Sequence, residues 1–215
     1  MSHSYCALAA AAYKERKSQK QLPAPPQQQA ATLLAVPLFH ATGSHAVYLA
    51  SYRHQRKIVS MYKWDAALAA ELIEVEKISS FIAPAAMTGD LVQEAIRTQR
   101  DLGSMVSVGG GGAPRAPEQV RNIEKSFTNA LPSTGWGMTE TNAIGTGIGG
   151  MDYLEHPESS GRCSAVMELS VIDDDGNAMA AGERGELLIR GAGVFRGYWN
   201  RPEASEETFL PGGWM

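Results

Sequence analysis

Hydrophobic and polar positions in the middle of the chain follow two alternating spacings. Short apolar runs at residues 32–36, 78–83 and 105–108 have the length of buried strands, and a further extended segment is predicted at residues 131–136. The segments between these runs repeat apolar residues every three or four positions, which is the spacing of a helix with one buried face. Strands that alternate with helices in this way predict a parallel α/β sheet.

Three helices are predicted in the intervening segments. Asp65 and Thr88 are placed to cap the first two, and Pro117 suits the first turn of the third. The predicted buried stripes are Leu68, Leu72 and Val75 in the first helix, Leu91, Val92, Ala95 and Ile96 in the second, and Val120, Ile123 and Phe127 in the third.

The two ends of the chain differ from this middle part. The N-terminal residues combine an alanine-rich helical stretch with a segment rich in proline and glutamine, which reads as a linker. Near the C-terminus, apolar and polar residues alternate over residues 167–171, and a second strand is predicted at residues 186–190, with a turn at Asp175 and Gly176. The predicted organisation is a helix and linker at 1–30, an α/β subdomain at 31–160 and a small antiparallel β unit at 161–215.

Composition removes several classes of function. The formal net charge is −4, so no basic surface indicates a nucleic-acid partner. The longest apolar runs are far shorter than a membrane span, and the charges near the N-terminus follow the apolar stretch, which is the wrong order for a secretory signal. Two cysteines, Cys6 and Cys163, are too few for a disulfide framework or a zinc site. These features predict a cytoplasmic protein with reduced thiols.

Glycines follow the third predicted strand at residues 109–112. Open α/β sheets bind ligands at the carboxyl ends of their strands, and glycines there allow the backbone to approach a ligand closely. The segment is neither G-x-G-x-x-G nor a phosphate loop ending in G-K-[ST], and a tight turn is the favoured explanation for the glycines by themselves.

The segment at residues 135–141, GWGMTET, combines several side chains that could bind a nucleotide. Glycines flank Trp136, whose ring could stack on a base, and the hydroxyl of Thr139 and the carboxylate of Glu140 follow directly. A carboxylate next to phosphates is favourable when a hard cation such as Mg²⁺ lies between them. A core tryptophan beside a surface Thr-Glu pair explains the same spacing, and the spacing does not choose between the two.

Several ordered stretches resemble the motifs of one family, the AMP-forming acyl-CoA synthetases of the adenylate-forming superfamily. The matching stretches are PLFHATG at 37–43, GGAP at 111–114, GWGMTET at 135–141, GELLIRG at 185–191 and RGYWNRPE at 196–203. The similarity covers about residues 30–215, and the fatty-acyl and long-chain CoA ligases resemble the chain most. The resemblance identifies the chain as an internal fragment of the N-terminal domain of such an enzyme.

The resemblance implies a role for each matching position. The adenine-binding positions would be Gly112, Ala113 and Trp136, and the other positions lining the AMP pocket would be Gly135, Gly137 and Met138. Thr139 would bind the α-phosphate, Glu140 would bind Mg²⁺, and His40 would stand near the reacting carboxylate. The family usually has tyrosine where this chain has Trp136, a change that removes a hydroxyl but keeps a stacking ring.

The implied reaction joins a carboxylic acid, with a fatty acid as the expected substrate, to the α-phosphate of ATP and then transfers the acyl group to the thiol of CoA. The phosphate loop that the family places before the PLFH segment, the aspartate that follows later and the catalytic lysine of the C-terminal domain have no counterpart in the sequence. The chain alone is therefore expected not to turn over. A non-catalytic, truncated module that binds a nucleotide or a partner is the alternative.

Other candidate sites have weaker support. A Rossmann-type cofactor protein would require the glycine fingerprint that is missing, and His40, His45 and His54 have no standard metal-ligand spacing. No G-x-S-x-G motif supports a serine hydrolase. The sequence leaves open the length of the acyl chain, the choice between CoA and a carrier-protein thiol, and the oligomeric state.

Overall fold

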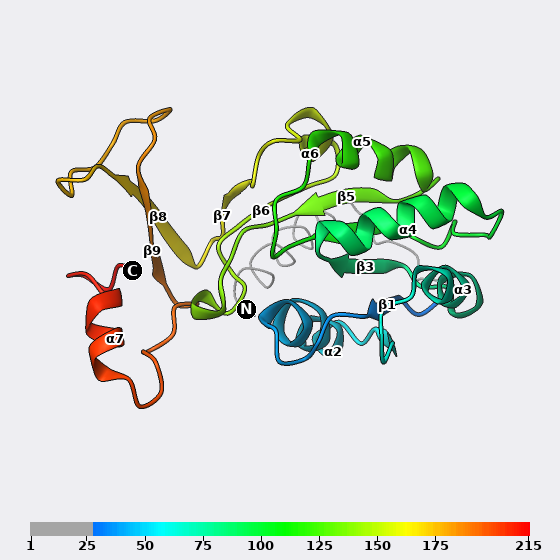
Figure 1. Cartoon of the computed structure of the whole chain (residues 1–215), viewed down its shortest axis with the longest axis horizontal. Coiled ribbons are helices and arrows are strands. Elements are labelled where there is room, and N and C mark those ends of the chain that lie inside the picture. Colours follow the sequence, from blue (N-terminus) through cyan, green and yellow to red (C-terminus); the bar gives the residue numbers. More distant parts are fainter. Residues whose placement is uncertain (1–27) are drawn as a thin grey trace, which may run out of the picture.

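The computed structural model describes residues 28–215, which form two β-sheets with helices packed around the larger one (Figure 1). In this part of the chain, the larger sheet has the strand order β2-β1-β3-β4-β5-β6-β7. Its strands are β1 (Ala31–Leu34), β2 (Lys57–Ser60), β3 (Ser80–Ala83), β4 (Ser107–Gly110), β5 (Leu131–Thr134), β6 (Thr146–Gly149) and β7 (Arg162–Cys163). Strands β1 to β5 are parallel, and β6 and β7 pair antiparallel.

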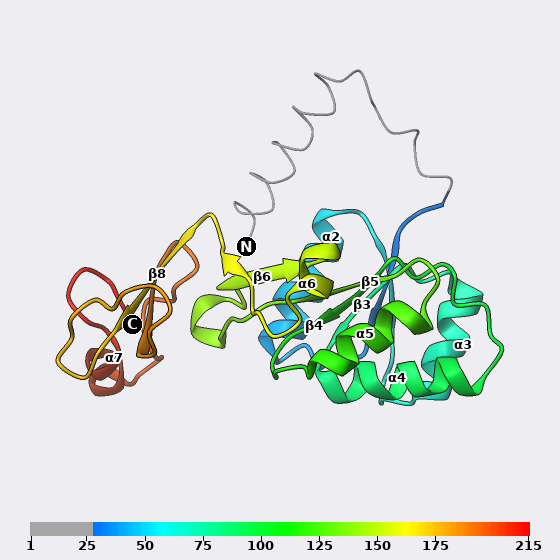
Figure 2. The ribbon, with the colours of Figure 1, turned by 90° about the horizontal axis from the view of Figure 1, so that it is seen from above.

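The smaller sheet pairs β8 (Met167–Ile172) with β9 (Glu186–Gly191) in antiparallel register, with Met167 opposite Gly191. Figure 2 shows this hairpin and the following helix α7 (Pro202–Thr208) at one end of the larger sheet. The predicted α/β class with a small antiparallel unit is confirmed. The predicted N-terminal helix and most of the linker lie outside the described residues. Within residues 28–215, no helix has the length and apolar character that a membrane crossing requires.

Helices cover both faces of the larger sheet (Figures 1 and 2). One face carries α3 (Ala66–Glu76), α4 (Ala85–Arg97) and α5 (Pro117–Ser126). The other carries the π-helix η1 (Thr42–Leu49), which continues into α2 (Ala50–Arg53), and a short helix α6 (Met151–Glu155) follows β6. The sequence pattern predicted α3, α4 and α5 but missed β2, β6, β7 and the short helices.

The buried face of α3 differs from the predicted one. The helix begins after Asp65, as expected, and the Asp65 carboxylate accepts a hydrogen bond from the backbone N–H of Leu68 at 3.0 Å. The residues that reach the core are Ala69, Ala70 and Ile73, whereas two residues of the predicted stripe, Leu68 and Val75, are exposed. Apolar residues surround most of this helix, so their spacing alone does not select one face.

Helix α4 begins one turn earlier than predicted. It starts at Ala85, directly after Pro84, and the Thr88 hydroxyl donates to the backbone carbonyl of Ala85 at 3.1 Å instead of capping the helix. Leu91 and Val92 are buried as expected, but Ile96 is 67% exposed. Pro84, immediately before the first turn, therefore marks this helix start better than Thr88 four positions later.

Candidate functional site

The ends of two neighbouring parallel strands place the glycine-rich segment beside the tryptophan segment. Strand β4 continues into Gly111 and Gly112, and β5 continues into Gly135 and Trp136, so both exits leave the same edge of the sheet. A cavity of about 340 Å³ lies between them, a size suited to a small ligand. Its lining residues are Gly112, Ala113, Pro114, Arg115, Thr134, Gly135, Trp136, Gly137, Tyr153, Pro157, Glu158, Ser159 and Ser160.

A second cavity of about 170 Å³ adjoins the first and shares Gly112, Gly135 and Gly137 with it. Its other lining residues come from η1, from the ends of β3, β4, β5 and β6, and from Ala143 in the loop before β6. Because the two cavities share these glycines, a ligand seated beside Trp136 could extend from one into the other.

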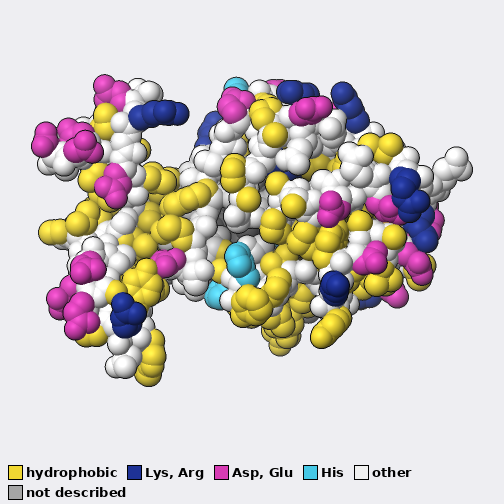
Figure 3. Space-filling view, in the orientation of Figure 1, with side chains coloured by type: hydrophobic (Ala, Val, Ile, Leu, Met, Phe, Trp, Pro, Cys, Tyr) yellow, Lys and Arg dark blue, Asp and Glu magenta, His cyan; other side chains and the backbone are white. Residues whose placement is uncertain are grey.

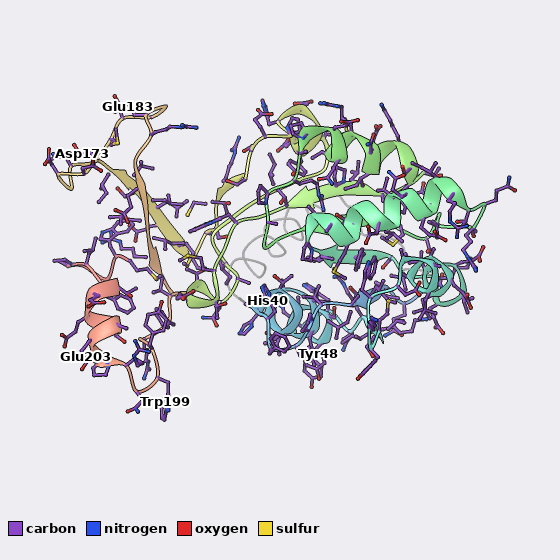
Figure 4. All side chains as sticks on the ribbon, in the orientation of Figure 1. His40, Tyr48, Asp173, Glu183, Trp199 and Glu203 are labelled. Carbon is purple, nitrogen blue, oxygen red and sulfur yellow. The ribbon has the colours of Figure 1, made fainter. Side chains whose placement is uncertain are left out.

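His40 lies beside the glycine loop. A Cβ atom placed on Gly112 would be 3.9 Å from Cε1 of His40. The backbone N–H of Thr42 donates to His40 Nδ1 at 3.2 Å, which restrains the ring and leaves Nε2 as the nitrogen not engaged in this bond. Figure 4 shows His40 at the start of η1, on the side that faces the hairpin of β8 and β9. His40 is therefore held by a local hydrogen bond and lies next to Gly112, and its predicted contact with the reacting carboxylate stays a prediction.

The Trp136 ring packs directly against Gly145. A Cβ atom placed on Gly145 would be 2.6 Å from Cε3 of the Trp136 ring, so only a glycine allows the ring to lie there. The Trp136 backbone N–H donates to Thr146 Oγ1 at 3.3 Å, and its carbonyl accepts from Thr146 N–H at 2.9 Å. The ring also packs against the small core around Ile144 and Met167. Trp136 is thus partly a core residue and partly a wall of the larger cavity.

Four predicted site residues, His40 among them, line neither of the two cavities. Met138 packs into the small core with Ile144 instead of lining either cavity. Thr139 is exposed at the start of the 3-10 helix η2 (Thr139–Thr141). Glu140 follows it, and its Oε1 accepts a hydrogen bond from the Tyr198 hydroxyl at 2.9 Å. The structure therefore gathers Gly112, Ala113, Gly135, Trp136 and Gly137 around one space and places Thr139 and Glu140 along the chain that leaves it.

Arg115 is a cavity residue that the sequence analysis missed. Its side chain is 7% exposed, and burial lowers the pKa of its guanidinium group below the usual value. Nη2 of Arg115 donates to Thr88 Oγ1 at 3.1 Å, and Nη1 donates to the Ser133 carbonyl at 3.4 Å. Within residues 28–215, no carboxylate forms an ion pair with this guanidinium group. Arg115 thereby links α4 and β5 beneath the glycine loop. Its position directly after Gly-Ala-Pro was the one available sequence signal.

The residues present fit a magnesium ion only as part of a nucleotide complex. Within the described residues, no three histidine, cysteine, aspartate or glutamate side chains gather as a metal-binding group. Glu140 offers carboxylate oxygen, which Mg²⁺ prefers, and Mg²⁺ is commonly held by one or two carboxylates with phosphate oxygens and water completing its shell. A cation at Glu140 would therefore take its remaining ligands from the phosphate and from water.

A family model for AMP-binding enzymes matches residues 1–199 of the chain. The chain belongs to the AMP-binding enzyme family. Among curated proteins, it is 30% identical over 191 residues to 4-coumarate–CoA ligase 5 of Oryza sativa subsp. japonica, which covers 85% of this chain and 35% of that protein. It is also 30% identical over 190 residues to 4-coumarate–CoA ligase 1 of Arabidopsis thaliana, over 85% and 33% of the two chains. The chain spans about a third of the length of these relatives.

Solved structures of this AMP-binding family share the fold. The N-terminal domain of FACL13 from Mycobacterium tuberculosis superposes with a TM-score of 0.78 at 27% identity, covering 89% of this chain and 48% of that one. A fatty acyl CoA synthetase from Mycobacterium tuberculosis gives a TM-score of 0.74 at 28% identity, over 87% and 36% of the two chains. The predicted family is confirmed. Because some relatives are named for 4-coumarate and others for fatty acyl groups, they do not single out the predicted fatty acid as substrate.

Proposed function

We propose that the cavity between the glycine loop and Trp136 binds the adenine of AMP, and that the chain is the AMP-binding core of an ATP-dependent acyl-CoA synthetase. The observation that carries the proposal is the placement of the Trp136 ring against Gly145, across one cavity from Gly112 and Ala113. A flat base would lie between the backbone of the loop and the indole. Stacking of a base on an aromatic side chain contributes about 1–3 kcal/mol.

The remaining residues suit the rest of an acyl-adenylate. Thr139 would donate its hydroxyl to the α-phosphate, a hydrogen bond to a charged group that contributes about 1.5–3 kcal/mol. Glu140 would hold a Mg²⁺ ion, which when bound neutralises phosphate charge. His40 lies next to Gly112, where the cavities adjoin, and its Nε2 would contact the carboxylate end of the acid. In the complete enzyme, the acid would attack ATP to give acyl-AMP and pyrophosphate, and the thiol of CoA would then displace AMP.

The substrate and the location of the protein belong to the same proposal. A small carboxylic acid is the substrate, with a fatty acid as the specific expectation, and CoA is the acceptor. The protein works in the cytoplasm with ATP and Mg²⁺. The proposed organisation is an α/β adenylate-binding part at residues 31–160 followed by the β unit at 161–215.

Replacement of Trp136 tests the adenine site. In calorimetric titrations of the purified chain with a stable acyl-adenylate mimic and Mg²⁺, Trp136→Ala is expected to weaken binding by about 1 kcal/mol or more, because the stacking surface is lost. Trp199→Ala is the matched control, since Trp199 is 96% exposed and lies outside both cavities. Equal affinities of the wild-type chain and Trp136→Ala would contradict the proposed site.

The purified chain alone is expected to show no acyl-CoA formation. Transfer at the α-phosphate needs hydrogen-bond donors and positive groups aimed at the developing charge, and the candidates in this chain are the Thr139 hydroxyl and a cation held by Glu140. A coupled pyrophosphate assay with ATP, Mg²⁺, CoA and a panel of fatty and aryl acids measures this. Pyrophosphate release above that of a Glu140→Gln control would show the expectation to be wrong.

A binding module without catalysis is the second candidate, and one surface favours it. Large apolar side chains are exposed on and around η1 and α2, including Phe39 at 91%, Tyr52 at 77% and Tyr62 at 107%. Figure 3 shows hydrophobic side chains gathered over this part of the molecule. Exposed apolar surface of this kind is typical of a docking face. Saturable adenylate binding by the chain, lost in Trp136→Ala, favours the synthetase core over a purely partner-binding module.

A further inference from the structure

Glu140 is held by a segment far away in the sequence. The hydroxyl of Tyr198, 58 residues along the chain, donates to Glu140 Oε1 at 2.9 Å. The backbone N–H of Phe195 donates to the Glu140 carbonyl at 2.8 Å. Both the side chain and the backbone of Glu140 are therefore fixed by the connection between β9 and α7.

Tyr198 is itself fixed in place. Its ring lies edge-on against Phe195, with centroids 4.8 Å apart, and Phe195 in turn packs against Phe209 at 5.6 Å. The Tyr198 backbone N–H donates to Ser205 Oγ at 2.9 Å. The Ser205 hydroxyl in turn donates to the Arg201 carbonyl at 2.9 Å. The phenol thus reaches Glu140 from an anchored ring, and the hydrogen bond restricts the rotation of the carboxylate.

We propose that Tyr198 is a positioning residue that orients the Glu140 carboxylate for a divalent cation bound with the nucleotide. This inference rests on the proposed role of Glu140. A carboxylate has two oxygens that each accept several contacts, so a hydrogen bond to Oε1 leaves Oε2 to face the cation. Groups that orient a metal ligand through a hydrogen bond typically change metal affinity by about 10–100-fold when they are removed.

The test compares Tyr198→Phe with the wild-type chain. The substitution removes the hydroxyl and keeps the ring that packs against Phe195, so the fold is retained. Mn²⁺ replaces Mg²⁺ as the probe, and electron paramagnetic resonance measures free Mn²⁺ during titration of the chain with AMP, with AMP alone as the blank. Glu140→Gln marks the loss of the carboxylate. Tyr52→Phe is the matched control, because Tyr52 is 77% exposed and lines neither cavity.

Tyr198→Phe is expected to weaken Mn²⁺ binding by about tenfold or more. Its affinity for AMP without metal is expected to equal that of the wild-type chain, a result that general structural damage would not give. Tyr52→Phe is expected to behave as wild type in both measurements.

Each contrary result has a separate meaning. If Glu140→Gln weakens Mn²⁺ binding and Tyr198→Phe does not, the positioning role is wrong and the proposed function stands. If Glu140→Gln leaves Mn²⁺ binding unchanged, the cation role of Glu140 and the role of Tyr198 are both wrong, although AMP binding remains. If the wild-type chain does not bind AMP, the proposed function and this inference are both overturned.

Discussion

Phe81→Ala is expected to lower the free energy of unfolding by about 3–5 kcal/mol, the range for removal of a fully buried aromatic side chain. Phe81 is completely buried on β3, and its ring stacks on Trp64 with the centroids 5.4 Å apart and the planes 8° from parallel. Strand β3 lies between β1 and β4 and pairs with both. The substitution would therefore remove packing from the middle of the larger sheet, next to β4, the strand that leads into the glycine loop.

Urea denaturation followed by circular dichroism measures this change. Phe39→Ala is the matched control, because the same side chain is removed from a position that is 91% exposed, and it should change stability by less than about 0.5 kcal/mol. A similar loss in both variants would mean that Phe39 is also packed against protein in solution. A loss below about 1 kcal/mol in Phe81→Ala would contradict the central place of β3 in the core.

The general position of the site follows from the sequence because its rule is topological. Parallel strands end at one edge of a sheet, so the residues after β4 and β5 must come together whatever the details of packing. The resemblance to the family implied that Gly112 and Trp136 share a ligand, and this topology explains why the two residues lie near each other. Arg115 could not be predicted in the same way, because a charged side chain that folds back beneath its own loop is decided by the tertiary space available to it.

The sequence pattern did not predict the buried face of α3 or the strand β6, because contacts with distant segments decide both. In α3, apolar residues surround the helix, and the small side chains of Ala69 and Ala70 turned inward while Leu68 remained outside. In β6, the segment from Thr146 to Gly149 has three residues with little or no apolar side chain, so it carries no strand pattern. Its place is set by hydrogen bonds to β5 and β7, contacts with distant segments that a local pattern does not encode.

The same limit applies to Trp136. Spacing left a core tryptophan and a ligand-facing ring as alternatives, and in the structure the same residue packs against a core and lines a cavity. The side toward Gly145 and Ile144 is packed, and the remaining part lines the cavity. A rigidly held ring is a better stacking surface than a mobile one, because less conformational entropy is lost when the base binds. The glycine behind the ring is therefore as important to the proposed site as the ring itself.

Gly145→Ala is expected to weaken AMP binding at least as much as Trp136→Ala and, in addition, to lower the free energy of unfolding by about 1–3 kcal/mol, the usual range for overpacking a buried position. Gly145 is buried, and a new methyl group there would meet both the Trp136 carbonyl oxygen and ring atom Cε3, the latter at 2.6 Å. The ring would have to move into the space proposed for adenine. Calorimetric titration with AMP and urea denaturation measure the two effects separately.

Gly89→Ala is the matched control, because a methyl group there would meet Gln119 Nε2 at an ordinary 3.5 Å and would lie outside both cavities, and this variant should bind AMP as the wild-type chain does. A double-mutant cycle then identifies the route of the effect. If Gly145→Ala acts by displacing the ring, it should cost no further AMP affinity in a Trp136→Ala background, where there is no ring to displace. Additive losses in the double variant would instead mean that Gly145 supports the cavity through the backbone of residues 144–146, independently of the indole.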